Sequence, residues 1–285
     1  MPTRSGTTSL HKEAHTPNAT PARSQTPARH PSTGKAGKES TSTESRAYFS
    51  PAALKFLRGL ERNNRREWFD PRKGEFEREL KYPMLEIIAQ VTAAMIDFAP
   101  AHMRPPQKCM MRIYRDTRFS TDKSPYKRHI AAWWSRAGLE KTSGGGFYLH
   151  VSAKEVVIAA GVYMPEREQL LAIRGFLLDH HEEVRRALHD KKLRRLMNSF
   201  EGLPLTRPPK GFAKDHPAMD LILCRQWGLA ATLPATAALE RNLVREIVTR
   251  FRLASPLVET LNTPLLSGLE RRKRVLFPMD GRMFG

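Results

Sequence analysis

One segment, from Arg112 to Lys127, contains five cationic side chains, two carboxylates and several hydroxyl groups. Cations that a folded loop brings together repel one another, so the loop needs an anion or a carboxylate near them. Arginine offers planar pairs of N–H donors that suit phosphate and carboxylate groups. The segment therefore predicts a binding site for a phosphorylated or carboxylated ligand. The expected ligand contacts are Arg112, Arg115, Arg118, Lys123 and Lys127.

The two carboxylates of this segment, Asp116 and Asp122, also allow a structural interpretation. Each can accept hydrogen bonds from neighbouring arginines and fix the loop as a salt-bridged latch. Both interpretations hold together if Asp116 orients Arg112 or Arg115 while other cations face a ligand. Catalysis would also need a nucleophile or an activated water, and nothing in the sequence activates a side chain of the segment. Whether the protein is an enzyme therefore stays open.

Five side chains are candidate neighbours of the predicted ligand site. Asp215 could orient His216 for proton transfer, although capping by Asp215 and packing by His216 are the simpler interpretation. His150 lies on the opposite strand face from Leu149, so it can share a surface with Arg112. The candidate neighbours are Tyr114, His150, Lys210, Asp215 and His216.

The sequence contains no recognisable metal or cofactor motif. In His180-His181-Glu182-Glu183, adjacent helical residues point in different directions, and the HExxH spacing is absent. Gly144-Gly145-Gly146 lacks the strand-to-helix context of a nucleotide-binding loop. Cys109 and Cys224 are the two cysteines of the chain, so a four-cysteine zinc site is excluded. We expect no metal site, and the sequence identifies no cofactor.

The charge of the chain limits its partners. Its 285 residues carry a formal net charge of +19, which favours anionic partners. No apolar stretch approaches the roughly 18 to 20 residues of a membrane span, and the first residues lack the apolar region of a secretory signal. We expect a cytoplasmic protein without a transmembrane segment. An anionic small molecule is the favoured partner and nucleic acid is the alternative, while the oligomeric state is not predicted.

Composition divides the chain into three segments. Residues 1–47 are rich in Ser, Thr, Pro and basic residues, so we expect a disordered arm. Residues 48–266 contain helical periodicity at both ends and strand-like alternation in the centre. Residues 267–285 form a basic C-terminal extension. The sequence thus predicts a single folded domain of the α+β class between two tails.

The periodicity of apolar residues predicts the elements of this domain. Ser50-Pro51 supplies a cap and a first-turn proline for a helix that ends at Asn63-Asn64. A final helix is expected to begin at Ser255-Pro256. The expected fold is a central antiparallel sheet covered by helices on one face, with the other face or its rim left for residues 112–127. Strands are expected near 109–113, 129–134, 147–151 and 156–162, and helices near 71–80, 83–95, 165–200 and 239–251.

Several short segments of this domain have a recognisable order and spacing. They are Tyr48-Phe49, residues 63–69, residues 112–127, Gly161 to Pro165, Pro209 to Phe212 and Asp215 to Pro217. Together they resemble the signature segments of a conserved hypothetical family, domain of unknown function 2461. The resemblance covers roughly Tyr48 to Leu266 and implies one α+β domain. It brings no activity, cofactor or catalytic residue to this chain.

Overall fold

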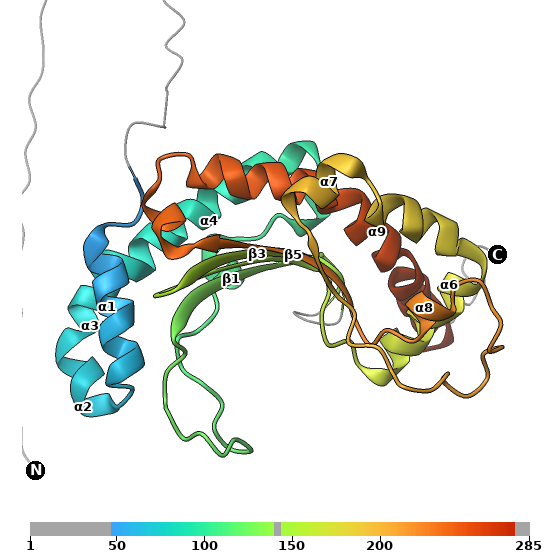
Figure 1. Ribbon diagram of the computed structural model, residues 1–285, viewed down its shortest axis with the longest axis horizontal. Helices are drawn as coiled ribbons and strands as arrows, with labels where there is room; N and C mark the ends of the chain where they lie inside the picture. Colours follow the sequence, from blue (N-terminus) through green and yellow to red (C-terminus); the bar gives the residue numbers. More distant parts are fainter. Residues whose placement is uncertain (1–46, 140–143, 277–285) are drawn as a thin grey trace, which may run out of the picture. The chain divides into compact units, whose positions relative to one another are not determined.

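The centre of the fold is an antiparallel sheet of five strands in the order β1-β2-β3-β5-β4 (Figure 1). The structure is a computed structural model that describes residues 47–139 and 144–276, with side chains up to residue 268. These residues belong to one unit, and the expected α+β class is confirmed. The predicted N-terminal arm up to residue 46 and the last part of the C-terminal extension lie outside the described residues.

Three of the five strands are those that alternation predicted. Between β2 and β3, the turn at Ser152 is held because Ser152 Oγ accepts hydrogen bonds from the backbone N–H groups of Lys154 and Glu155. The strands β4 and β5 were not predicted, because that part of the chain was expected to be helical. The strands are β1 (His129–Ser135), β2 (Gly146–Ser152), β3 (Glu155–Val162), β4 (Ser199–Glu201) and β5 (Trp227–Pro234).

Helices account for most of the remaining described residues. The first is capped as predicted, because Ser50 Oγ accepts from the backbone N–H of Ala52. Among the described residues, no helix is both long and apolar enough to cross a membrane. The α-helices are α1 (Pro51–Arg62), α2 (Arg66–Phe69), α3 (Lys73–Phe76), α4 (Tyr82–Ala94), α5 (Pro106–Cys109), α6 (Arg167–Leu188), α7 (Lys191–Leu196), α8 (Met219–Ile222) and α9 (Leu243–Leu276). Shorter helical turns connect α2, α3 and α4 at Asp70–Arg72 and Glu77–Lys81, and others lie at Met95–Asp97, Pro100–His102 and Ala235–Leu239.

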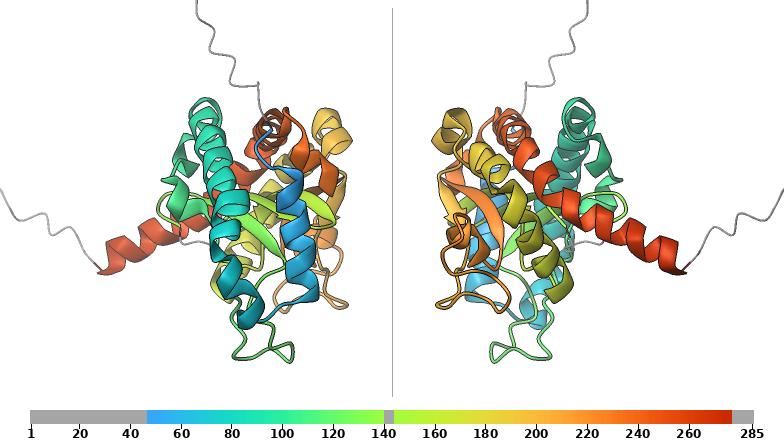
Figure 2. Two further views of the ribbon diagram at one scale, coloured as in Figure 1. Left: turned by 90° about the vertical axis from the view of Figure 1, so that its left-hand side faces the viewer. Right: turned by 90° about the vertical axis from the view of Figure 1, so that its right-hand side faces the viewer.

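Helices α4 and α9 cover one face of the sheet, as Figures 1 and 2 show. The ring of Phe251 in α9 lies 4.9 Å from that of Phe147 and 5.4 Å from that of Trp134, measured between centroids. Trp134 Nε1 donates to Thr92 Oγ1 in α4 over 2.8 Å. These contacts join both helices and two strands in one apolar core, and they leave the opposite face of the sheet uncovered by α4 and α9.

Two local predictions were wrong. The expected strand at 109–113 is absent, because Pro106 opens the helical turn α5 and Met110 forms only an isolated bridge to Ala132. The expected helix start at Ser255-Pro256 lies inside α9. Ser255 does not cap a helix there, because its Oγ donates to the carbonyl oxygen of Phe98 over 2.7 Å. Packing on the core therefore outweighs the local proline signal at Pro256.

Candidate functional site at the open face of the sheet

Residues 112–127 form a long loop that extends from the sheet edge on the side opposite α4 and α9 (Figure 1). Backbone hydrogen bonds close its base: Arg115 N donates to Pro125 O over 2.9 Å, and Lys127 N donates to Ile113 O over 2.7 Å. Tyr114 and Tyr126 form a bridge between the two arms. The loop therefore has a paired base that fixes where its tip begins.

Asn64 anchors this loop to the end of α1. Its side-chain amide donates to Tyr126 O over 2.9 Å and accepts from Tyr126 N over 3.0 Å. The ring of Tyr126 stacks on that of Phe69 with centroids 4.2 Å apart, and Tyr126 is buried. The segment that follows α1 thus has a structural role that its polar composition alone did not reveal.

The tip of the loop is joined by ion pairs within the loop. Arg118 pairs with Asp116 in two parallel contacts, Nε to Oδ1 at 3.0 Å and Nη2 to Oδ2 at 2.7 Å. These hydrogen bonds from Arg118 lower the pKa of Asp116 to about 2. Arg115 Nη1 donates to Asp122 Oδ2 over 2.6 Å, and Lys123 Nζ donates to the carbonyl oxygen of Thr117 over 3.0 Å. The contacts of Arg115 and Arg118 favour the latch interpretation for these two residues.

The second carboxylate of the loop is held more by a serine than by an arginine. Asp122 Oδ1 accepts from both the backbone N–H and the hydroxyl of Ser124, at 2.9 and 2.5 Å. These two bonds, followed by that from Arg115, place the pKa of Asp122 far below its usual value. Asp122 is therefore ionised at neutral pH and orders the turn, as the latch interpretation expects.

Arg112 and Lys127 lie at the base of the loop. Arg112 is exposed and forms no hydrogen bond or ion pair with the described residues, although its charge helps to lower the pKa of Asp116. The charge of Lys127 contributes to lowering the pKa of His129, the first residue of β1. The ring of Tyr114 packs 5.4 Å from that of Tyr126. His129 therefore lies where the cationic loop joins the sheet.

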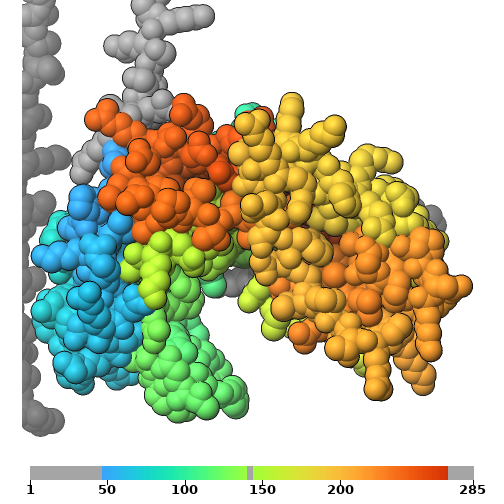
Figure 3. Space-filling view, in the orientation of Figure 1, coloured from blue at the N-terminus to red at the C-terminus, as the bar shows by residue number. Residues whose placement is uncertain are grey.

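Beneath the uncovered face of the sheet lies a hollow, which Figure 3 shows between the 112–127 loop and the segment around residues 200–225. Strand alternation and register place mostly small side chains on the middle of this face. The small residues are Ala131 of β1, Ala159 and Gly161 of β3, and Gly228 and Ala230 of β5. The backbone of the sheet therefore forms much of the floor, and larger side chains stand at its β1–β2 end.

Two of those larger side chains and Glu155 are joined by one hydrogen bond and one ion-pair contact. Tyr148 Oη lies 3.1 Å from His150 Nδ1, and His150 Nε2 lies 3.6 Å from Glu155 Oε1. The ring of His129 stacks on that of His150 at 4.7 Å. Because a carboxylate only accepts, Nε2 carries the proton toward Glu155, and Nδ1 is left to accept from the Tyr148 hydroxyl. A tyrosine hydroxyl is thus connected through an imidazole to a carboxylate.

Burial sets the protonation of this cluster. It raises the pKa of Tyr148 to about 12 and lowers that of His129 to about 4. Burial also lowers the pKa of His150, although Glu155 acts in the opposite direction. Both imidazoles are therefore neutral at pH 7, and His150 can accept a proton. Ionisable groups with perturbed pKa values in a hollow are typical of functional sites.

Stability should depend on pH through His129. Its pKa of about 4 in the folded protein is below the usual 6.5, so the unfolded chain binds more protons between these values. The free energy of unfolding should therefore fall by roughly 2 to 3 kcal/mol as pH decreases from about 7 to about 4. Urea denaturation across this range should show a weaker pH dependence for His129→Gln. Parallel curves for parent and variant would contradict the assignment.

The other candidate neighbours lie away from the 112–127 loop. Figure 1 shows the segment around residues 203–217, which contains Lys210, Asp215 and His216, at the other end of the fold from this loop. His216 Nδ1 accepts from Ala218 N over 3.1 Å, and its ring lies 5.6 Å from that of His181. These contacts support packing as the role of His216. No cluster of three or more His, Cys, Asp or Glu side chains in the described ranges could hold a metal ion.

Sequence reasoning missed part of the open face. His150 was a candidate, but Tyr148, His129 and Glu155 were not. The alternation that placed His150 on this face also places Tyr148 there, so that signal was available. The other two needed the register, which pairs His129 with Ser152 and places Glu155 directly after the hairpin turn. A further side chain of this face, Trp133, has a buried Nε1 without a hydrogen-bond partner in the described structure.

One family model matches residues 52–259 of the chain, and its description is Conserved hypothetical protein (DUF2461). The matched range contains the whole sheet, the 112–127 loop and the helices from α1 into α9. Searches of curated proteins and of solved structures gave no match. The description of the family names no activity or ligand.

Proposed function

We propose that this chain, which belongs to the DUF2461 family of conserved hypothetical proteins, binds a phosphorylated or carboxylated small molecule in the hollow beneath the sheet. The observation that carries the proposal is the Tyr148–His150–Glu155 chain on the open face, beside the base of a loop with five cations and two carboxylates. The hollow that Figure 3 shows beneath this face offers space for a ligand. Trp133 Nε1 supplies a buried donor on the same face.

The chain of three side chains could exchange a proton with such a ligand. A ligand atom can accept a hydrogen bond from the Tyr148 hydroxyl, or the hydroxyl proton can pass to His150 Nδ1 while Tyr148 Oη takes a proton from the ligand. In the second case His150 becomes an imidazolium, and the carboxylate of Glu155 stabilises it. The high pKa of Tyr148 keeps its hydroxyl protonated at rest, so the donor is present before the ligand binds.

The cations of the loop take different roles in this proposal. Arg112 and Lys127, at the base of the loop, are assigned the ligand contacts nearest the sheet. Arg115 and Arg118 hold the tip through Asp122 and Asp116 and contribute positive potential. Lys123 keeps its contact with the carbonyl oxygen of Thr117. This division follows the loop contacts and combines the binding and latch interpretations.

Removal of the Arg112 charge should weaken ligand binding without unfolding the protein. A charged hydrogen bond contributes about 1.5 to 3 kcal/mol, so Arg112→Gln should reduce affinity by at least about tenfold. The measurement is a thermal-shift titration with inorganic phosphate, pyrophosphate and citrate, because a ligand of the native state raises its stability. Lys192→Gln, which removes an exposed charge on α7, is the matched control and should change affinity by less than about twofold.

Two outcomes of this titration would contradict the proposal. One is that none of the three anions stabilises the parent protein. The other is that an anion stabilises the parent and Arg112→Gln equally, because that anion would then bind at a site without Arg112. A single-stranded oligonucleotide tested in parallel separates the alternative: stabilisation by the oligonucleotide alone, with a steep salt dependence, would favour a nucleic-acid-associated protein instead.

A further inference from the structure

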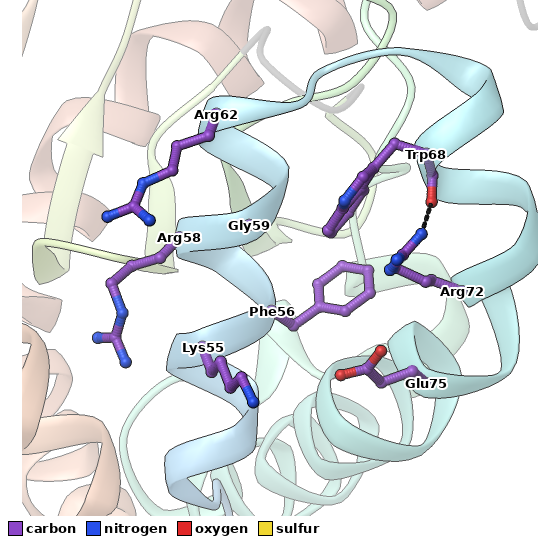
Figure 4. Close-up of a pocket in the computed structure, with 8 residues that line it drawn as sticks. All are labelled: Lys55, Phe56, Arg58, Gly59, Arg62, Trp68, Arg72 and Glu75. Carbon is purple, nitrogen blue, oxygen red and sulfur yellow. Dashed lines mark hydrogen bonds between the residues drawn. The ribbon is translucent and has the colours of Figure 1, made fainter.

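A second basic site lies on the helical side of the molecule, between α1 and the run from α2 to α3. It is a pocket of ≈ 450 Å³ (Figure 4). Four cationic side chains and one carboxylate line it. The lining residues are Lys55, Phe56, Arg58, Gly59, Arg62, Trp68, Arg72 and Glu75. None of these belongs to the 112–127 loop or to the open face of the sheet.

The cations of this pocket come together because of helical spacing. Lys55, Arg58 and Arg62 are three, four and seven residues apart in α1, so they share one exposed face of the helix. None of the three forms a hydrogen bond or ion pair with another described residue. Figure 4 shows Arg58 and Arg62 extending from one side of α1, whereas Trp68, Arg72 and Glu75 lie on the helical segments on its other side. The pocket therefore has a net positive charge, because Glu75 is the single carboxylate beside four cations in its lining.

An indole and a glycine give the pocket its floor. The ring of Trp68 packs against Gly59 so closely that a Cβ atom there would lie 2.7 Å from its Cζ2. The guanidinium of Arg72 lies 4.8 Å from the Trp68 ring centroid, and its Nη1 donates to Trp68 O over 3.0 Å. Arg72 is thus held in place beside Trp68, with its other N–H donors still available.

We propose that this pocket is a binding site for a small molecule that carries two or more phosphate groups. Lys55 and Arg62 are separated by about 10 Å along α1, at 1.5 Å per residue, which is more than one phosphate can bridge. The volume is within the roughly 300 to 1,000 Å³ of small-molecule sites. Separate phosphates can pair with Arg62 at one end of this face of α1 and Lys55 at the other, with Arg58 between them.

Calorimetric titration of the full chain with inorganic triphosphate, pyrophosphate and monophosphate tests this site. Triphosphate should bind in a saturable manner and more tightly than monophosphate. The double substitution Arg58→Gln/Arg62→Gln should weaken triphosphate binding at least tenfold. The matched double substitution Lys192→Gln/Arg241→Gln removes two exposed charges elsewhere and should leave the affinity within about twofold of the parent. The same titrations in the Arg112→Gln background, where binding in the hollow beneath the sheet is weakened, should show the same loss on Arg58→Gln/Arg62→Gln, which separates this site from the hollow.

Equal triphosphate affinity in the parent and in Arg58→Gln/Arg62→Gln would overturn the proposal, as would non-saturable binding. A parallel sedimentation assay uses phosphatidylcholine vesicles with and without phosphatidylglycerol, because phosphate groups also occur on lipid surfaces. Association with the anionic vesicles that depends on Arg58 and Arg62, without saturable triphosphate binding, would identify a membrane surface and contradict a small-molecule site. The proposal predicts the opposite pattern.

Discussion

Replacing Gly161 with alanine is expected to destabilise the fold by roughly 3 to 5 kcal/mol. Gly161 has a φ of +135° in β3, a backbone conformation that side chains disfavour. A Cβ atom there would lie 2.2 Å from Trp227 O and 2.6 Å from Gly228 Cα. Both are backbone atoms of the neighbouring strand β5, so relief would require the two strands to separate. Urea denaturation of the purified variant measures the loss.

The matched control for this substitution is Gly175→Ala. Gly175 is exposed in α6, has a helical backbone, and a Cβ atom there would have no neighbour within 4 Å. Alanine is a better helix former than glycine, so this variant should gain up to about 1 kcal/mol. If Gly161→Ala changed the free energy of unfolding as little as Gly175→Ala does, β3 and β5 would not be packed as described. The residues assigned to the floor of the hollow would then be wrong as well.

Replacing Asn64 with alanine is expected to lower the free energy of unfolding by about 2 to 4 kcal/mol. The substitution removes both hydrogen bonds to the backbone of Tyr126, a buried residue, and leaves its N–H and C=O without those partners. The base of the 112–127 loop would lose its anchor to α1. Arg112 and Lys127 would then be held less firmly, so the affinity for an anion in the hollow should fall as well.

Asn63→Ala separates the anchor from a general effect of the connector. Asn63 donates from Nδ2 to the carbonyl oxygen of Gly59 at the end of α1, over 3.0 Å. Its loss should cost about 1 kcal/mol and leave anion binding unchanged. Urea denaturation gives both stabilities, and the thermal-shift titration gives both affinities. If Asn64→Ala were no more destabilising than Asn63→Ala, Tyr126 would not depend on the anchor.

Local patterns predicted those elements in which the order of apolar and polar residues reveals which side chains are buried. Strands β2 and β3 alternate between buried and more exposed positions over most of their length, and period-two patterns indicate such strands. Strand β1 is almost wholly buried and was predicted from its short apolar run. Strand β5 contains Gly228, Ala230 and Ala231, whose small side chains carry little alternation. Strand β4 has three exposed residues and pairs only with β5. These two strands exist because of tertiary pairing, which local propensity does not encode.

The candidate site also has one part that the sequence predicts and another that depends on tertiary contacts. The density of charges predicted that residues 112–127 form a special loop, and its tip contacts lie within nine residues of one another. Its anchor joins residues that are 62 positions apart, which no local pattern shows. The basic pocket was open to prediction, because Lys55, Arg58 and Arg62 have helical spacing on the polar face of a predicted helix. The position of Arg72 beside α1 depends on the packing of α2 and α3 on α1, which no local pattern shows.

The most direct test of the central claim, that the hollow beneath the sheet is a ligand site, is a histidine NMR titration. The imidazole signals of His129 and His150, assigned with His129→Gln and His150→Gln, are followed while the anion with the largest thermal shift is added. Both signals should move in a saturable manner, and that of His189, whose Nδ1 lies 2.8 Å from Arg185 O at the end of α6, should not. Saturable binding of the anion with unchanged His129 and His150 signals would contradict the account.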